Sequence, residues 1–133
     1  YGKLKMNKLI STDKAPPAFS NYAQAVEVPA NARTLTVSGQ SGVALDGTLP
    51  TNATAQHELA WRNVFAVLAA AGMDKTDIVD VLVIVRDSSG VPIFRQVRDQ
   101  MLEGHIAAST LLVCGLASPD WKVEIAVKAA KVG

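Results

Sequence analysis

Residues 78–86, IVDVLVIVR, form an almost continuous apolar run that is rich in β-branched side chains. Residues 111–114, LLVC, are likewise apolar at both odd and even positions. A strand with this pattern is typical of a sheet that is buried on both faces. The sequence therefore predicts two strands, over residues 78–86 and 109–116, in a sheet that needs a covering layer on each side.

Two amphipathic segments can supply one of these layers. The first follows a helix cap at Thr51 or Asn52 and stops at Gly72, a residue suited to a helix C-terminus. The second spans residues 92–103, with Pro92 near its start. Apolar side chains recur in both at spacings of three and four: Ala60, Trp61, Val64, Phe65, Leu68 and Ala71 in the first, and Phe94, Val97 and Met101 in the second.

Further strands are expected toward both ends of the chain. Residues 21–29 and 33–39 flank a turn and are predicted to pair as an antiparallel hairpin, and residues 121–129 form a last strand. A short extra strand is expected near residues 9–11, and residues 39–52 form the longest loop. This order of strands and helices predicts an α/β fold with both helices on one face of the sheet.

The second face of this sheet has no helix left to cover it. Because the strands over 78–86 and 109–116 are apolar on both faces, another copy of the chain is the simplest covering layer, and we expect an obligate oligomer. The alternative is a two-layer monomer with an unusually apolar open face.

Length and composition limit the class of protein. The chain has 133 residues, which suits one domain, with 49% hydrophobic residues and a formal net charge of +1. These values exclude intrinsic disorder and argue against a general nucleic-acid binder, which would be strongly basic. No apolar run is long enough for a membrane span, and the first residues do not form a signal peptide, so we expect a cytoplasmic protein. We expect residues 1–7 to be an N-terminal extension or cloning remnant, followed by one domain over 8–133.

Few residues carry an obvious chemical signature. His57 lies among polar residues, including Gln56 and Glu58, on what should be the polar side of the first helix, and His105 lies in a turn, so both are interpreted as solvated. Cys114 lies within an apolar strand and is interpreted as a small hydrophobic residue without a disulfide partner. No metal-ligand spacing and no nucleotide-binding motif occurs, so no metal or cofactor is expected.

Glu124 is the most informative polar residue. In residues 121–129 the side chains of Trp121, Val123, Ile125 and Val127 point to one face, so Glu124 points to the other. That other face is the one expected to meet a partner subunit. A carboxylate there must be paired or hydrated. It is either a structural ion pair with a Lys or Arg, or a group that lines a pocket between subunits.

Several segments, taken in order, resemble the RidA/YjgF family of reactive-intermediate deaminases. They are Asn21–Ala25, Thr36–Gln40, a helix with Gln56 and Asn63 that ends in Ala69–Gly72, Asp77–Asp80, Ala108–Thr110 through Gly115–Leu116, and Lys122–Ile125. The resemblance covers about residues 10–131. It implies a chorismate-mutase-like fold with a mixed sheet, a homotrimer with a central sheet barrel, and clefts between subunits. The implied activity is hydrolysis of reactive enamines or imines to keto acids and ammonia, without metal or cofactor.

The same resemblance implies a set of site residues. Matching positions are Glu124, which would orient water, and the substrate-binding candidates Tyr22, Ser38, Gly39, Ser109 and Thr110. The arginine that grips the substrate carboxylate in active members corresponds to Ala108, and a helix position that often holds asparagine is Arg95. This variant motif resembles the subgroup that includes 2-aminomuconate deaminase. Arg95 or Arg98 could replace the missing cation, or both could be solvated helix residues.

Two classes of function follow from these residues. The first is a hydrolytic deaminase of a small, carboxylated, enamine-type metabolite. The second is a trimer that binds such a metabolite without catalysis or acts like a chaperone. Ribonuclease action, which has been attached to relatives, finds little support, because the charge is balanced and no basic stripe with interleaved aromatic residues is present. We expect neither nucleic acid nor membrane as a partner.

Overall fold

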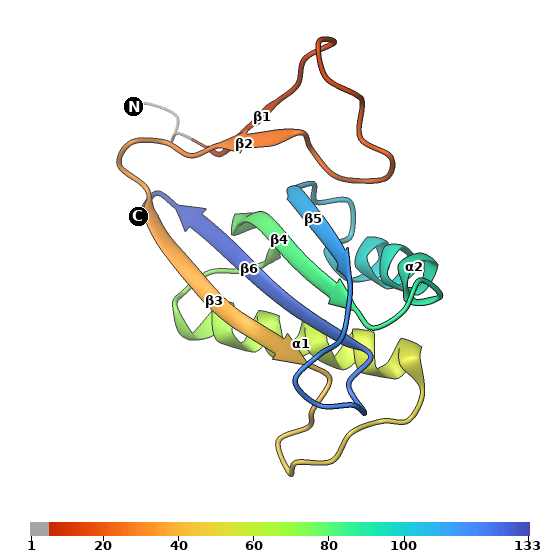
Figure 1. Cartoon of the computed structure of the whole chain (residues 1–133). Coiled ribbons are helices and arrows are strands. Elements are labelled where there is room, and N and C mark those ends of the chain that lie inside the picture. The colour runs from red at the N-terminus through yellow and green to blue at the C-terminus, as the bar shows by residue number, and fades with distance from the viewer. Residues whose placement is uncertain (1–5) are drawn as a thin grey trace.

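The computed structural model describes residues 6–133 and has a two-layer α/β architecture, with a separate two-stranded ribbon near the N-terminus (Figure 1). Residues 1–5 of the extension expected over 1–7 lie outside the described residues, whereas the Asn7 side chain donates a hydrogen bond to the carbonyl of Ala130. The elements in chain order are β1 (Lys8–Ile10), β2 (Ala25–Glu27), β3 (Arg33–Ser41), α1 (Ala53–Ala70), the short 3₁₀ helix η1 (Lys75–Asp77), β4 (Ile78–Val85), α2 (Gly90–Leu102), β5 (Ala108–Val113) and β6 (Val123–Lys131).

The main sheet has the strand order β3-β6-β4-β5. Strands β4 and β5 run parallel and are joined through α2, whereas β6 runs antiparallel to both of its neighbours. The sheet is therefore mixed, and α1 and α2 pack together on one of its faces. The predictions of an α/β fold with two helices on one face, and of strands over 78–86 and 121–129, are confirmed.

The predicted hairpin between residues 21–29 and 33–39 is wrong. Strand β2 pairs with β1, placing Val26 opposite Leu9, and β3 pairs with β6, placing Val37 opposite Val127. Alternation of apolar and polar side chains predicts a strand but not its partner. The apolar side of β3 reaches the buried core, while the N-terminal segment that carries the β1–β2 ribbon meets the edge strand β5 through a bridge between Ala23 and Ala108.

Helix α1 begins and ends where its sequence predicts. The Asn52 side chain accepts a hydrogen bond from the backbone N–H of Ala55 at 3.0 Å, which caps the first turn. At the other end, Gly72 has a φ of +72°, a conformation that glycine adopts without a steric penalty. These two residues therefore set the limits of α1.

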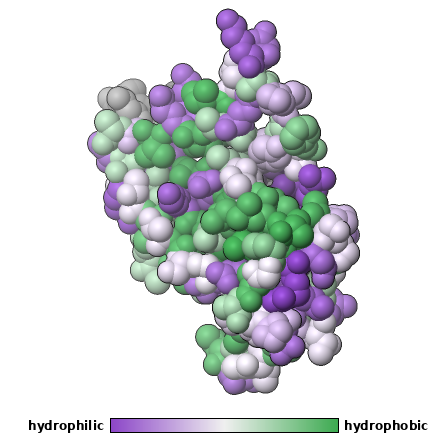
Figure 2. All heavy atoms as spheres, in the orientation of Figure 1, coloured by the Kyte–Doolittle hydropathy of each residue, from purple (hydrophilic) through white to green (hydrophobic). Residues whose placement is uncertain are grey.

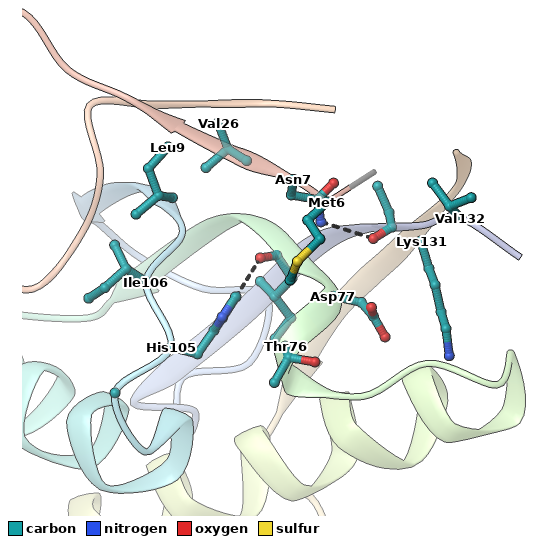
Figure 3. A pocket seen from close by; sticks show the side chains of 13 residues that line it. Met6, Asn7, Leu9, Val26, Thr76, Asp77, His105, Ile106, Lys131 and Val132 are labelled. Carbon is teal, nitrogen blue, oxygen red and sulfur yellow. Dashed lines mark hydrogen bonds between the residues drawn. The ribbon is translucent and has the colours of Figure 1, made fainter. Parts of the chain in front are cut away.

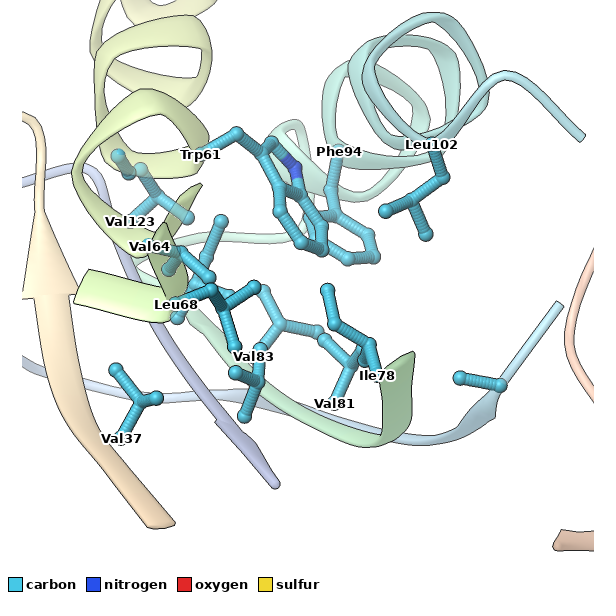
Figure 4. Packing of buried hydrophobic residues seen from close by; sticks show 14 of the residues in the cluster. Val37, Trp61, Val64, Leu68, Ile78, Val81, Val83, Phe94, Leu102 and Val123 are labelled. Atoms are coloured by element: carbon cyan, nitrogen blue, oxygen red, sulfur yellow. The ribbon is translucent and has the colours of Figure 1, made fainter. Parts of the chain in front are cut away.

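The core lies between the helices and the sheet (Figure 4). Trp61 of α1 stacks on Phe94 of α2 with ring centroids 6.2 Å apart. Below them, Val81 and Val83 of β4 and Ile125 of β6 are almost fully buried. Large side chains on the helices and branched side chains on the strands thus form one continuous apolar layer.

Two polar residues of α1 are buried, contrary to their predicted positions on a solvated face. His57 is fully buried, and its Nδ1 lies 2.8 Å from the carbonyl oxygen of Ala53. Gln56 is also buried; it donates hydrogen bonds to the carbonyls of Pro50 and Asp120 and accepts one from the N–H of Lys122. Backbone partners from loops distant in sequence satisfy the Gln56 amide, which explains why burial is tolerated.

Cys114 is exposed and lies just past the end of β5, so the prediction that it stands within a strand is wrong. Strand β5 ends at Val113, and Cys114 follows it, with its N–H donating to the carbonyl of Val85. The neighbouring strand β4 ends at Val85 as well. The apolar run over residues 111–114 therefore continues beyond the end of β5, into a position that is exposed to solvent.

Within residues 6–133, no part of the chain covers the sheet face opposite the helices, which is called the open face below. Leu82 and Leu112 on this face are 38% and 45% exposed. Figure 2 shows a broad hydrophobic area over the strands on the visible side of the molecule. No helix among the described residues is long and apolar enough to cross a membrane. A single copy of the chain thus leaves apolar sheet surface in contact with water.

Candidate functional site

Glu124 lies on the open face of the sheet. Its neighbours in the strand, Val123 and Ile125, are fully buried under the helices, so the predicted phase of β6 is confirmed. On the open face, Glu124 is opposite Ser41 of β3 and Ile84 of β4, and it is half-buried. The strand pattern alone therefore aims this carboxylate away from the core of its own chain.

The carboxylate of Glu124 is packed against the backbone of Gly39. The register of β3 shifts between Val37 and Gln40, which places Gly39 in an irregular stretch beside β6. A Cβ atom at residue 39 would stand 2.0 Å from Oε2 of Glu124. Only a glycine leaves this space free, so the absence of a side chain at residue 39 fixes where the carboxylate lies.

No cation of the described chain neutralises Glu124. Ion pairs within residues 6–133 join Lys75 to Glu103 and Arg98 to Asp99, and neither includes Glu124. The interpretation of Glu124 as a structural ion pair therefore has no partner within that part of the chain. A half-buried carboxylate without an internal counter-ion is free to bind water or a ligand.

The candidates on β5 divide between the two faces of the sheet. Ala108 lies opposite Asp80, and Thr110 lies opposite Leu82, so both belong to the open face. Ser109 lies opposite Val81, which faces the helices. Along β4, the level of Ala108 is four residues from that of Glu124, which is about 13 Å at the usual rise of a strand.

Of the remaining candidates, Tyr22 and Arg95 lie away from Glu124 within one chain, whereas Ser38 lies near it. Tyr22 is half-buried where the N-terminal segment meets β5, and its hydroxyl accepts a hydrogen bond from the N–H of Phe19. Arg95 is exposed on α2, in the layer on the other side of the sheet. Ser38 is exposed beside Gly39 in the irregular part of β3. One copy of the chain brings together Ser38, Gly39 and Glu124 but not the other candidates.

Arg98 is buried rather than solvated. Its side chain is 5% exposed, its Nη2 lies 3.0 Å from Oδ1 of Asp99, and its Nη1 donates to the hydroxyl of Ser20. The guanidinium also lies over the ring of Phe94, 5.7 Å from its centroid. Arg98 thus ties α2 to the N-terminal segment, and its donors are directed into the protein.

Sequence reasoning overlooked Arg86. This residue follows β4 and is half-buried; its Nε donates to the carbonyl of Trp121 at 2.8 Å and its Nη2 donates to the carbonyl of Ser118. The alternation that places Ile84 on the open face also places Arg86 there, a signal that was present in the sequence. The carbonyl partners come from the loop before β6 and could not be inferred from local pattern.

A separate cavity of about 450 Å³ lies between the β1–β2 ribbon and the main sheet (Figure 3). Leu9, Val26 and Ile106 line it, together with Asp77 and His105. The Nε2 of His105 lies 2.8 Å from the carbonyl oxygen of Ile78, so the ring is held against the sheet rather than freely solvated. Glu124 does not line this cavity.

Within residues 6–133, no three side chains of His, Cys, Asp or Glu converge to form a metal-binding group. Burial lowers the pKa of His57 below its ordinary value of 6.5, because the protonated ring would lose hydration in the core. His57 therefore belongs to the packing of α1 on α2. On the open face, the Glu124 carboxylate lies beside exposed backbone and apolar surface, and the second carboxylate of that face, Asp80, is four residues away along β4.

Known proteins resemble this chain over nearly its whole length. Residues 12–131 match the family model described as endoribonuclease L-PSP. The 2-iminobutanoate/2-iminopropanoate deaminase of Rattus norvegicus is 30% identical over 122 residues, covering 90% of this chain and 87% of the rat protein. TdcF of Escherichia coli is 31% identical over 110 residues, covering 82% of this chain and 83% of that protein.

Solved structures share the fold. The Rid-family protein YyfB of Yersinia pestis superposes with a TM-score of 0.82 at 25% identity, covering 96% of this chain and 100% of that chain. The structure of E. coli TdcF with bound serine has a TM-score of 0.71 at 27% identity, with coverages of 93% and 98%. The family match, the relatives at about 30% identity and the shared mixed sheet with two helices agree, and the chain belongs to the RidA/YjgF family, whose sequence model bears the name endoribonuclease L-PSP.

Proposed function

We propose that this protein hydrolyses a small, carboxylated enamine or imine to a carbonyl compound and ammonia, in the cytoplasm as its family resemblance implies. The observation that carries the proposal is the position of Glu124: half-buried on the open face, packed against Gly39, and unpaired within residues 6–133. The deaminase named in rat, 30% identical to this chain, supports the reaction class.

The proposed site needs a second copy of the chain. Ala108 and Glu124 are separated by about 13 Å along one sheet, too far for both to contact one small metabolite. A neighbouring copy that covers the exposed Leu82 and Leu112 would remove apolar surface from water. We propose the homotrimer that the family resemblance implies, with a central sheet barrel and with clefts between subunits.

In such a cleft, one copy would supply Ser38, Gly39 and Glu124. The other would supply Ala108 and Thr110 from the open face of β5 and Tyr22 from the adjoining N-terminal segment. Ser109 and Arg95 are candidates of the family resemblance, but Ser109 faces the helices and Arg95 lies in the helix layer of its own chain. The division rests on the distance of about 13 Å between Ala108 and Glu124 within one chain. It makes each cleft a joint product of two sheets, because neither half contains both the carboxylate and the β5 positions.

The role of Glu124 is to hold and deprotonate water. An enamine first takes a proton on carbon to become an iminium ion. Water then attacks the C=N carbon while Glu124 accepts a proton from that water. Glu124 returns this proton to the amino group of the tetrahedral intermediate, the C–N bond breaks and ammonia leaves. The hydroxyl group loses its proton as the C=O group forms, which replaces the proton consumed in the first step. One water is consumed and no electron is transferred, so the step needs only acid–base groups and a positioned substrate.

Ala108 directs the proposal toward a divergent member of the family. The family resemblance implies an arginine at this position in active members, whereas Ala108 offers no donor beyond its backbone. We therefore place the protein with the subgroup that includes 2-aminomuconate deaminase. The same observation favours the second candidate function, metabolite binding without turnover in the same cleft.

Ribonuclease activity is not proposed, because a net charge of +1 does not provide the excess of positive charge that binding to a nucleic-acid backbone needs.

The test is Glu124→Gln, which keeps the shape of the side chain and removes its charge. With 2-iminobutanoate or 2-iminopropanoate generated in situ, release of ammonia should fall by about 100-fold, the usual scale for a positioned acid–base group. Thermal melting should change little. Glu27→Gln, at an exposed position of β2, is the matched control and should retain full activity.

Three outcomes separate the candidate functions. Hydrolysis by the wild type that Glu124→Gln abolishes supports the enzyme. Binding of the keto acid without any hydrolysis by the wild type supports the non-catalytic function. A Glu124→Gln variant that melts far below the wild type, or that dissociates, identifies Glu124 as a structural residue and contradicts the proposed site.

A further inference from the structure

Arg86 is a diagonal neighbour of Glu124 on the open face. Ile84 lies opposite Glu124 and Val85 lies opposite Val123, so the next pair, joined by a hydrogen bond from the N–H of Arg86 to the carbonyl of Lys122, returns to the face of Glu124. Diagonal neighbours across an antiparallel pair have Cα atoms about 7–8 Å apart, which long side chains can bridge. Arg86 therefore starts from a backbone position next to that of Glu124, and its guanidinium lies against the loop before β6 without forming an ion pair with Glu124.

The guanidinium of Arg86 is held by one of its two edges. Nε and Nη2 donate to the carbonyls of Trp121 and Ser118, and these atoms form the side edge of the group. Nη1 makes no hydrogen bond within residues 6–133, so the end edge, made of Nη1 and the second N–H of Nη2, keeps its donors available. Two parallel N–H donors on one edge match the two oxygens of a carboxylate.

The carbonyls that hold Arg86 belong to a loop that is itself fixed. Gln56, which is 1% exposed, donates to the carbonyl of Asp120 and accepts from the N–H of Lys122. The loop before β6 is thus tied to α1 on one side and to Arg86 on the other. Since the partners of Arg86 cannot shift freely, its end edge is oriented before any ligand arrives, which reduces the entropy lost on binding.

The other cations are less suited to this task. Arg98 is buried and directed toward Asp99, and Arg95 lies in the helix layer of the same chain. Lys128 shares the face of Glu124 but lies four residues farther along β6, about 13 Å away. Lys122 is near Glu124 in sequence but is exposed, and its ammonium makes no hydrogen bond within residues 6–133. Its charge is therefore not held in one orientation, and it lacks the two parallel N–H donors of a guanidinium.

We propose that the free edge of Arg86 binds the substrate carboxylate and takes the role of the arginine that the family resemblance implies at the position of Ala108. This inference rests on the proposed function, and it adds the recognition element that the deaminase site otherwise lacks. The ligand class is a small organic carboxylate whose reacting carbon lies over Glu124.

The experiment compares two probes that differ in the carboxylate. They are 2-oxobutanoate, the product expected from 2-iminobutanoate, and butan-2-one, which has the same carbonyl without the acid. Dissociation constants are measured by NMR titration of the ¹⁵N-labelled protein. Arg86→Gln should weaken binding of 2-oxobutanoate at least about tenfold and leave butan-2-one within twofold. Lys122→Gln, which removes the same charge from the neighbouring position, should change neither by more than twofold.

The two probes separate recognition from support of the loop. If Arg86 only holds the loop, Arg86→Gln weakens both probes equally, and the inference is wrong. It is also wrong if Arg86→Gln binds 2-oxobutanoate as the wild type does, or if Lys122→Gln causes the larger loss. A wild-type protein that binds neither probe contradicts the proposed function together with the inference, whereas the preceding outcomes contradict the inference alone.

Discussion

The carboxylate of Glu124 occupies the space in which the side chain of residue 39 would stand, since a Cβ on Gly39 would lie 2.0 Å from Oε2. Glycine is therefore needed at residue 39 because it has no side chain. Its backbone conformation does not require glycine, because the φ of Gly39 is not positive. Two strands that are distant in sequence thus define one half of the proposed site. The position of the carboxylate depends on both residues together.

Gly39→Ala should displace the Glu124 carboxylate and reduce hydrolysis about 100-fold, because the acid–base group leaves its place. The colliding atoms belong to the end of a flexible side chain. The cost in free energy of unfolding should therefore lie at the low end of the roughly 1–3 kcal/mol usual for overpacking. Activity and chemical denaturation measured on the same sample check both values.

Gly115→Ala is the matched control, because a Cβ at Gly115 meets no atom within 4 Å and its φ is not positive. This variant should keep both activity and stability. If Gly39→Ala were as active as the wild type, the packing of Glu124 on Gly39 would have no part in the reaction.

Leu82→Asp should dissociate the proposed trimer. Leu82 lies on the open sheet face and is 38% exposed, so a charge there would be buried without a partner in the interface. Light scattering of the wild type should give about three times the chain mass of 14.0 kDa, and the variant should approach one chain mass. Hydrolysis should be lost in parallel, since each cleft needs two copies.

Val67→Asp provides a control of equal exposure on a different surface. Val67 is also 38% exposed, but it lies on α1, away from the sheet face. The trimer should survive this change. A wild type that is a stable monomer at micromolar concentration would contradict both the packing argument and the proposed cleft.

Ala108→Arg should increase hydrolysis of 2-iminopropanoate about tenfold over the wild type. Residue 108 is half-buried on the open face, where a guanidinium would add a second fork for the substrate carboxylate. The wild type itself should turn over this substrate slowly. Steady-state release of pyruvate measures both rates, and rapid turnover by the wild type would show that residue 108 does not limit recognition.

His57 should make the fold less stable in mild acid. Burial holds the pKa of His57 below 6.5 in the folded protein, so the unfolded chain binds a proton that the folded chain does not. Above pH 6.5 both states are neutral and the group has no effect. As the pH falls below 6.5, stability declines until the folded pKa is reached. His57→Gln cannot ionise, so its free energy of unfolding should depend less on pH between 7 and 5.

Urea denaturation of both proteins at pH 8, 7, 6 and 5 measures this difference. The comparison is made within each protein, relative to its value at pH 8, because the substitution also changes packing. Equal pH dependence of the two proteins would mean that the buried ring titrates normally.

The phase of β6 could be predicted because it follows from local alternation. Val123 and Ile125 are apolar and Glu124 is not, and this suffices to separate the two faces. The limits of α1 were equally local, since Asn52 and Gly72 act within one turn. The part of the site that lies on β6 was therefore accessible from the sequence.

The rest depended on contacts between distant segments. Glutamine is a residue type that usually lies on the surface, and the hydrogen bonds to the carbonyls of Pro50 and Asp120 are what make the burial of Gln56 favourable. The exchange of partners between β2 and β3 is similar, because alternation carries no information about which strand lies alongside. Arg86 was overlooked for the same reason, since its partners lie in a loop that local pattern does not place.

The position of β6 between β3 and β4 also affects how the chain must fold. No two strands of the four-stranded sheet form a hairpin, and the one pair adjacent in sequence, β4 and β5, is parallel and joined through α2. The β4–α2–β5 unit is thus the part of the sheet that can assemble with the shortest loop closure. Arg33 meets Lys131 only after almost the whole described chain has come together, so we expect a slow folding step in which β6 enters last.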